Sequence, residues 1–204
     1  MARMAMLLLA CLRGNIFIYQ GEELGLPQAN IPFEQLRDPE AIANWPLTLG
    51  RDGARTPVPW TAATSEAPKP GVETWLPIPT EHRALAVDLQ EADSGSQLAY
   101  TRHVLALRNR HEALKRGSLR PLETPQPVLA FEREAVGERL LCVFNLGTTS
   151  LTWRPENAGE KERAWRVIER SAQGNDQGND QGNDNRDGWN LPPLSGLVAQ
   201  RSRR

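Results

Sequence analysis

The sequence has few of the residues that build metal centres or disulfide frameworks. It contains two cysteines and three histidines in 204 residues. Cys11 and Cys142 are far apart and match no metal-binding or redox spacing. A reduced, cytoplasmic protein is the simplest expectation, with a single long-range disulfide as the alternative. His82, His103 and His111 have no partner at ligand spacing, so we predict no metal and no cofactor.

A surplus of either charge is also absent, since the sequence has 24 basic and 25 acidic residues. Without a basic surplus, we expect no binding to nucleic acid or to an anionic membrane. The apolar run Met4–Leu12 is too short to cross a bilayer. Arg13-Gly14 follows it, where a signal peptide would carry small cleavage-site residues. We expect instead a buried helix over residues 3–13 that needs neighbours on most sides.

Tyrosine is scarce, with two copies against six tryptophans. Proline and glycine are abundant, with 16 of each, which favours long, irregular loops. The surplus of tryptophan has two interpretations. These side chains pack in a core, or they offer flat platforms to sugar rings.

Helix, turn and strand signals follow one another at the start of the chain. Gly14 ends the apolar helix, and residues 15–19 form an aromatic and Ile-rich run typical of a buried strand. A polar loop begins at Gln20. This order is one step of a parallel α/β fold, in which functional loops leave the carboxyl ends of the strands. Residues 24–95 are expected to form a long irregular region held by scattered apolar anchors.

The second half of the chain changes from helical spacing to a period of two. Residues 97–116 predict an amphipathic helix, with Ser96 as its N-cap and Gly117 as its stop. Short strands without intervening helices then indicate an antiparallel sandwich. The predicted strands are residues 128–133, 139–145, 151–153, 165–168 and 197–199.

Residues 173–184 are three copies of Gln-Gly-Asn-Asp. This segment has no apolar residue with which to offset the entropy of ordering, so we expect a disordered loop near residues 173–188. Its Asp and Asn content suggests calcium. The best loop match, however, places Leu194 where a bidentate Glu is needed, so we predict no calcium site.

Three motifs occur in a fixed order: Gly14–Leu26 (GNIFIYQGEELGL), Gly50–Trp60 (GRDGARTPVPW) and Trp75–Pro79 (WLPIP). Together they resemble the α-glucosidase and oligo-1,6-glucosidase branch of the α-amylase superfamily, glycoside hydrolase family 13. The resemblance covers nearly the whole chain. It implies an α/β plus all-β fold, namely the last strand and helices of a (β/α)8 barrel followed by an antiparallel β-sandwich. Residues 1–116 would be the barrel part and residues 117–204 the sandwich.

The resemblance assigns Arg51 to the pocket that holds the non-reducing glucose. A guanidinium binds carboxylates or sugar hydroxyls through a rigid fork of donors. Asp52 is expected to orient Arg51, while Arg55 and Trp60 brace and pack the loop at the mouth of the site.

Other residues near the first motif are weaker candidates. Glu22 and Glu23 look like a glycosidase carboxylate pair, but neighbours on an extended chain point to opposite faces. We expect them, with Gln20, to hold the loop through hydrogen bonds. The loop that follows could line the pocket through Gln28, Phe33 and Glu34, although simple exposure explains each of them equally well.

The catalytic carboxylates of the family have no counterpart here. In the family they are an aspartate nucleophile, a glutamate acid/base and a further aspartate in an Asn-His-Asp pattern, and this pattern does not occur in the sequence. We therefore expect a C-terminal fragment of a retaining α-glucosidase, acting on α-glucoside oligosaccharides and inactive alone. Its expected partner is the N-terminal barrel segment, without which the chain should aggregate. The alternative is a non-catalytic sandwich that binds carbohydrate or a partner protein.

Overall fold

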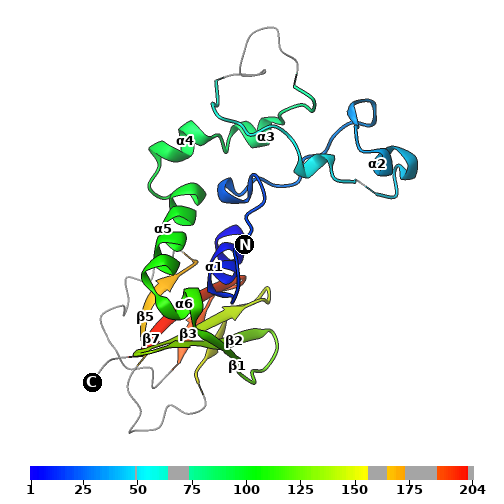
Figure 1. Cartoon of the computed structure of the whole chain (residues 1–204). Helices are drawn as coiled ribbons and strands as arrows, with labels where there is room; N and C mark the ends of the chain where they lie inside the picture. The colour runs from blue at the N-terminus through cyan, green and yellow to red at the C-terminus, as the bar shows by residue number, and fades with distance from the viewer. Residues whose placement is uncertain (49, 64–73, 156–164, 173–187, 202–204) are drawn as a thin grey trace. The chain divides into compact units, whose positions relative to one another are not determined.

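The computed structural model describes residues 1–48, 50–63, 74–155, 165–172 and 188–201 (Figure 1). The chain divides into two compact units: unit 1 combines Met1–Ile16 with His103–Arg204, and unit 2 is Phe17–Arg102. This division groups the N-terminal helix with the C-terminal strands. The boundary at residue 117 concerns the domains of a whole enzyme and stays a prediction. The Gln-Gly-Asn-Asp repeat lies outside the described residues.

Unit 1 is built on a five-stranded antiparallel sheet. In spatial order its strands are β1 (Ser118–Pro121), β2 (Val128–Ala135), β3 (Glu138–Asn145), β7 (Ser195–Arg201) and β5 (Trp165–Arg170). Strands β4 (Leu151–Trp153) and β6 (Trp189–Leu191) pair as a second, smaller sheet. Each strand predicted after Gly117 is present, which confirms the antiparallel sandwich, whereas β1 and β6 were not predicted.

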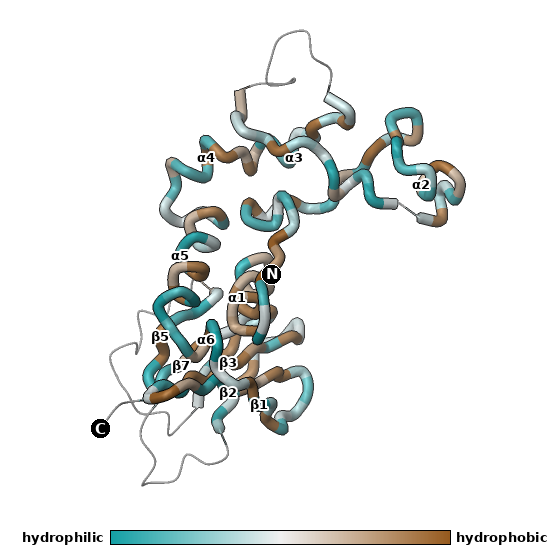
Figure 2. The backbone as a smooth tube through the Cα atoms, viewed as in Figure 1, coloured by the Kyte–Doolittle hydropathy of each residue, from teal (hydrophilic) through white to brown (hydrophobic). Residues whose placement is uncertain are grey.

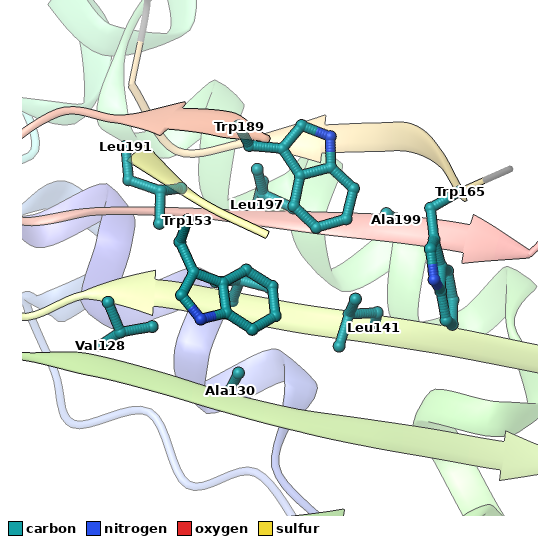
Figure 3. Packing of buried hydrophobic residues seen from close by; sticks show 10 residues of the cluster. Val128, Ala130, Leu141, Trp153, Trp165, Trp189, Leu191, Leu197 and Ala199 are labelled. Atoms are coloured by element: carbon teal, nitrogen blue, oxygen red, sulfur yellow. The ribbon is translucent and has the colours of Figure 1, made fainter. Parts of the chain in front are cut away.

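One face of the large sheet forms an apolar core with β4 and β6. Trp153 and Trp189 stack with their ring centroids 6.1 Å apart, and Trp165 packs into the same cluster. Figure 3 shows these rings among the aliphatic residues of β2, β3 and β7. The three tryptophans are 8%, 6% and 9% exposed. They pack in a core, and they do not form the exposed sugar platform that the alternative interpretation requires.

Helices α1 (Ala2–Cys11) and α6 (Glu112–Arg116) contact the same large sheet, α1 on β3 and β7 and α6 on β2 and β3. Figure 2 shows the largely hydrophobic character of α1. Its buried side chains are Met4, Met6, Leu7, Ala10 and Cys11. The apolar helix predicted at residues 3–13 therefore finds its neighbours within this chain.

Two arginines of unit 1 bind the carbonyl groups at the end of α1. The last carbonyls of a helix lack intrahelical partners, and guanidinium groups supply several donors each. Arg133 is fully buried, and burial lowers the pKa of both Arg108 and Arg133. The acceptors are the carbonyls of Ala10, Leu12 and Gly14 for Arg108, and of Cys11, Gly117 and Ser118 for Arg133.

The helix predicted over residues 97–116 is present as α5 (Gln97–Arg110) and α6, with a break at His111. Glu138 explains the break. Its carboxylate accepts the backbone N–H of Ala113 at 2.8 Å and lies 2.6 Å from His111 Nδ1. A carboxylate at a helix start satisfies a donor that has no intrahelical acceptor.

Unit 2 consists of short helices joined by loops around a small apolar cluster of Ala29, Ile31, Leu36, Ala41 and Leu76. The region predicted as irregular is thus partly helical. Its helices are the 3₁₀ turns η1 (Glu22–Leu24), η2 (Phe33–Gln35) and η3 (Asp52–Ala54), and α2 (Pro39–Asn44), α3 (Thr80–Arg83) and α4 (Val87–Ala92).

The strand expected at residues 15–19 is absent. Phe17 is 81% and Tyr19 51% exposed. A barrel strand hydrogen bonds to a neighbour on each side, and no segment of the described chain forms such a ladder with these residues. The composition of residues 15–19 is typical of a strand, but the described residues contain no strand that pairs with them.

Candidate functional site

A cluster of charged side chains in unit 2 is centred on Arg51. Its Nε and Nη2 donate to the two carboxylate oxygens of Asp38 at 2.9 and 2.8 Å. The backbone N–H of Arg51 donates to the same carboxylate at 2.9 Å. The side chain of Asp38 is 0% exposed and that of Arg51 61%. One edge of the guanidinium is therefore fixed, while its other donors remain accessible.

The ion pair changes the acidity of both partners. The pKa of Asp38 lies well below its ordinary value of 3.8, chiefly because the Arg51 side chain donates hydrogen bonds to it. The same hydrogen bond raises the pKa of Arg51. Each group stabilises the charged form of the other, so the pair stays ionised through the neutral pH range.

Asp52 fixes the backbone of the segment that carries Asp38. It is 1% exposed, and its Oδ2 accepts the backbone N–H groups of Arg37 and Asp38 at 2.6 and 2.8 Å. Its Oδ1 has no hydrogen-bond partner within the described ranges. Among the bonds of the described residues, Asp52 does not bind the Arg51 side chain. The orienting role expected of Asp52 would therefore be indirect, since Asp52 fixes Asp38 and Asp38 binds Arg51.

Two glycines make the close approaches that this cluster needs. Gly50 has φ +55°, and a Cβ there would lie 2.5 Å from Ala41 Cβ and 2.9 Å from Asp38 Oδ2. A Cβ on Gly53 would lie 2.3 Å from the carbonyl oxygen of Ala29. A side chain at either position would displace backbone. The Gly-Arg-Asp-Gly motif therefore reflects packing around Arg51 on both sides.

Asp38 is a residue that the sequence interpretation missed. It precedes Pro39 at the start of α2, and its Oδ1 accepts the backbone N–H of Glu40 at 3.3 Å. Asp before Pro and Glu is a typical helix start, and this signal was available in the sequence. Nothing in the sequence links it to Arg51, which lies 13 positions further on.

The polar residues of the first motif bind their own loop. Glu22 accepts the backbone N–H of Tyr19 at 2.9 Å, and Glu23 accepts that of Gly21 at 2.8 Å. Gln20 Nε2 reaches the carbonyl of Thr56 at 3.5 Å. The two carboxylates thus have local backbone partners and form no pair facing a common ligand.

The remaining candidates are exposed, and among the contacts of the described residues none joins them to Arg51. Phe33 packs against Trp45 with ring centroids 5.7 Å apart, while Gln28 and Glu34 lie at the surface. Trp60 is 65% exposed. The carbonyl of Arg55 accepts the indole N–H of Trp75 at 3.2 Å. Their roles at a substrate pocket stay predictions.

His82 is a second structural residue that the sequence did not reveal. It is 1% exposed. Its Nε2 lies 2.7 Å from the carbonyl of Pro27, so Nε2 carries the proton, and Nδ1 accepts the hydroxyl of Thr56 at 3.0 Å. This histidine joins α3 to two loops. Its two hydrogen bonds satisfy both ring nitrogens and so explain why the imidazole is buried.

Within the described residues, no helix has the length and apolar character needed to cross a membrane. The same part of the chain holds no group of three or more His, Cys, Asp or Glu that could bind a metal ion. Cys11 and Cys142 are both free and buried. They lie against each other, and burial is the main reason that the pKa of Cys142 is raised.

The sandwich, the helices and the three motifs define a class of carbohydrate-active enzyme, and sequence comparison identifies it. The family model described as "Alpha amylase, catalytic domain" matches residues 1–117. The chain belongs to the α-amylase family. A relative from Rhizobium meliloti (strain 1021) named "Probable alpha-glucosidase" is 40% identical over 154 residues, which are 74% of this chain and 27% of the relative.

Solved structures show the same relationship. An α-glucosyl transfer enzyme, XgtA, is 37% identical with a TM-score of 0.77, over 98% of this chain and 35% of that one. Trehalose-6-phosphate hydrolase from Bacillus licheniformis has a TM-score of 0.82 at 20% identity, over 99% of this chain and 38% of the enzyme, and shows the fold alone. The 204 residues thus span about a third of the length of these relatives.

Proposed function

We propose that residues 1–204 supply one wall of the active site of a retaining α-glucosidase, with Arg51 binding the non-reducing glucose of the substrate. The observation that carries this proposal is the fork between Arg51 and buried Asp38, which fixes a guanidinium in one orientation while 61% of its side chain stays exposed. An arginine fixed in this way loses little entropy when it binds hydroxyl or carboxylate oxygens. The motif that contains it is one of the three on which the resemblance to α-glucosidases rests.

The chemistry of such an enzyme needs two carboxyl groups about 5–5.5 Å apart. One attacks the anomeric carbon, and the other protonates the leaving oxygen and later activates water. Asp38 and Asp52 are engaged with Arg51 and with backbone N–H groups, and Glu22 and Glu23 bind their own loop. We therefore propose that residues outside these 204 provide the catalytic pair, and that this chain alone is inactive.

Exposed apolar side chains support a partner segment for unit 2. Phe17, Tyr19, Leu47, Trp60 and Trp75 are 81%, 51%, 89%, 65% and 51% exposed. Phe17 and Tyr19 lie where the resemblance places the last strand of a barrel. A barrel strand is covered by its neighbours, so we propose that the other barrel strands are the partner of this region. The reduced state of the two cysteines agrees with a cytoplasmic setting, which is likewise part of the proposal.

The proposal is tested in a chimera in which residues 1–204 replace the matching segment of the Rhizobium meliloti relative. We expect the chimera to hydrolyse p-nitrophenyl α-glucoside. Arg51→Ala should lower kcat/KM by about 10- to 100-fold, because a hydrogen bond from a charged donor is lost. Arg37→Ala, an exposed arginine one residue before Asp38, is the matched control and should change kcat/KM by less than about threefold.

Two results would contradict the proposal. The first is a folded chimera in which Arg51→Ala and Arg37→Ala have equal activity, which removes Arg51 from the site. The second is release of glucose from maltose by the purified 204-residue chain alone, which would show that the chain carries its own catalytic carboxylates.

A further inference from the structure

Cys142 points away from the tryptophan core of unit 1. Its neighbours in β3, Leu141 and Val143, are members of that core, and successive side chains of a strand point to opposite faces of the sheet. Helix α1 contacts β3, and Cys11 is one of its buried residues. The face of β3 that carries Cys142 is therefore available to α1, while the other face is filled by the tryptophans.

Arg133 shows independently that the end of α1 lies over this face. Cys142 is directly opposite Phe131 in the ladder between β2 and β3, and Arg133, two positions from Phe131 along β2, shares its face. The guanidinium of Arg133 donates to the carbonyl oxygen of Cys11. The strand register and this hydrogen bond thus bring Cys11 to the same side of the sheet as Cys142.

The side chains of the two cysteines are in contact. Both are 0% exposed, and a hydrogen bond joins their thiol groups. A disulfide needs Cβ atoms about 3.5–4.5 Å apart, and two thiols in contact are close to this arrangement. Since the sequence has two cysteines, this is the one disulfide that can form within the chain.

Burial makes the pair slow to react. It is the main cause that raises the pKa of the Cys142 thiol, followed by the hydrogen bond with Cys11. The thiolate is the reactive form of cysteine, so reaction begins when a local opening of unit 1 brings one thiol into contact with water. After closing, the same burial protects the product from reduction. The pair is thus suited to a durable cross-link and not to rapid sensing.

We propose that Cys11 and Cys142 are an oxidation site at which a small-molecule disulfide, with glutathione disulfide as the probe, forms a cross-link between α1 and β3. The thiolate of one cysteine attacks a sulfur of glutathione disulfide, and one glutathione thiolate leaves. The second cysteine attacks the mixed disulfide, so that the bond between the two protein sulfurs forms and the second glutathione leaves. Two electrons pass from the protein to glutathione disulfide, and the two cysteine protons go to the two glutathione thiolates.

The cross-link closes the chain around unit 2. Cys11 precedes residues 17–102 in the sequence, and Cys142 follows them, whereas both cysteines belong to unit 1. A closed loop of this length restricts the unfolded chain more than a short loop does. The two separate segments that build unit 1 are then joined covalently as well as by the hydrogen bonds of Arg133.

The equilibrium between thiols and disulfide tests this proposal on the full 204-residue chain. The chain is brought to equilibrium in glutathione buffers from the reduced and from the oxidised side, and mass spectrometry of acid-quenched digests measures how much of the Cys11 peptide is joined to the Cys142 peptide. The equilibrium constant should be about 30- to 700-fold larger in native buffer than in concentrated urea, because a disulfide that stabilises the folded state is favoured by folding to the same extent.

A matched variant moves one thiol to the other face of the sheet. Cys142→Val combined with Val143→Cys keeps the composition of the chain, but its thiol faces the tryptophans, so the constant in native buffer should fall to the value in urea or below. Mixing ¹⁵N-labelled with unlabelled chains separates cross-links within a chain from those between chains. The proposal is overturned by equal constants in native buffer and urea, by equal constants in the wild type and the variant, or by peptide pairs that combine labelled with unlabelled chains. None of these results bears on Arg51.

Discussion

Unit 1 and unit 2 are each stabilised internally by a different kind of interaction. Unit 1 has a continuous ladder of five strands and a core of aromatic and aliphatic side chains. Unit 2 has a small apolar cluster, and its loops are joined by a few polar side chains such as Asp38, Asp52, His82 and Gln90. The first kind of order is spread over many contacts, whereas the second depends on individual residues.

This difference agrees with the substrate-binding role that we propose for Arg51. A sheet core gains about 25 cal/mol for each Å² of apolar surface that it buries, and small errors in one side chain are shared among many. A loop that binds substrate through one guanidinium, as proposed for Arg51, cannot bury that group. Hydrogen bonds from a few side chains to the backbone hold the rest of the loop in place instead.

The largest expected effect is in the sheet core. Trp189→Ala should lower the free energy of unfolding of unit 1 by about 3–5 kcal/mol, because it removes a large side chain and leaves a cavity. Urea unfolding, followed by the fluorescence of the remaining tryptophans, measures this change. Val136→Ala in the β2–β3 turn, where Val136 is fully exposed, is the control and should stay within about 0.5 kcal/mol. Equal midpoints for both variants would refute the assigned core.

A smaller effect is expected at the glycine beside Arg51. Gly50→Ala should destabilise unit 2 by about 2–3 kcal/mol, because it adds a clash with Ala41 to an unfavourable positive φ. Gly137→Ala has a similar φ of +74° but open space around the added Cβ, so it should cost only about 1 kcal/mol. Amide hydrogen exchange at Ile42 and in the hairpin reports the two losses. If the two substitutions cost the same, the close packing of Gly50 is disproved.

The smallest effect concerns pH. Since the pKa of Asp38 is lowered on folding, its stabilising contribution is complete above its ordinary value of 3.8 and is lost as the pH falls toward the folded value. In Arg51→Met the pKa of the Asp38 carboxyl should rise toward 3.8, which carboxyl ¹³C NMR detects. Arg37→Met should leave it unchanged. A titration of Asp38 that is identical in the wild type and in Arg51→Met would show that the ion pair does not form.

The sequence predicted the sheet well because its signals are local. The period of two and Gly137 define β2 and β3 almost to the residue. The predicted helix at residues 97–116 was correct in extent, but its break at His111 is caused by Glu138, which lies 27 positions further along the chain. The prediction of a strand at residues 15–19 was wrong, because strand formation depends on neighbouring strands as well as on composition.

The candidate site was predictable only in part. Arg51, Gly50 and Gly53 stand in one motif and could be selected from it. Asp38 could not be connected to Arg51, because an ion pair between two loops leaves no periodicity in the sequence. A charged cluster of unit 1 was missed for a related reason. Glu132 binds both Arg120 and Arg139, and only the register of β1, β2 and β3 brings these three residues together.

The hydrogen bonds to the carbonyl groups at the end of α1 determine which part of this protein can be transferred to another protein as a folded unit. A shortened protein beginning at residue 117 would keep every strand, yet it would take from Arg133 the Cys11 carbonyl that it binds. Such a protein would retain an interior guanidinium with fewer acceptors, and a buried charge without partners is strongly destabilising. The smallest transplantable block is therefore discontinuous: a graft of the sandwich has to bring the first sixteen residues with it.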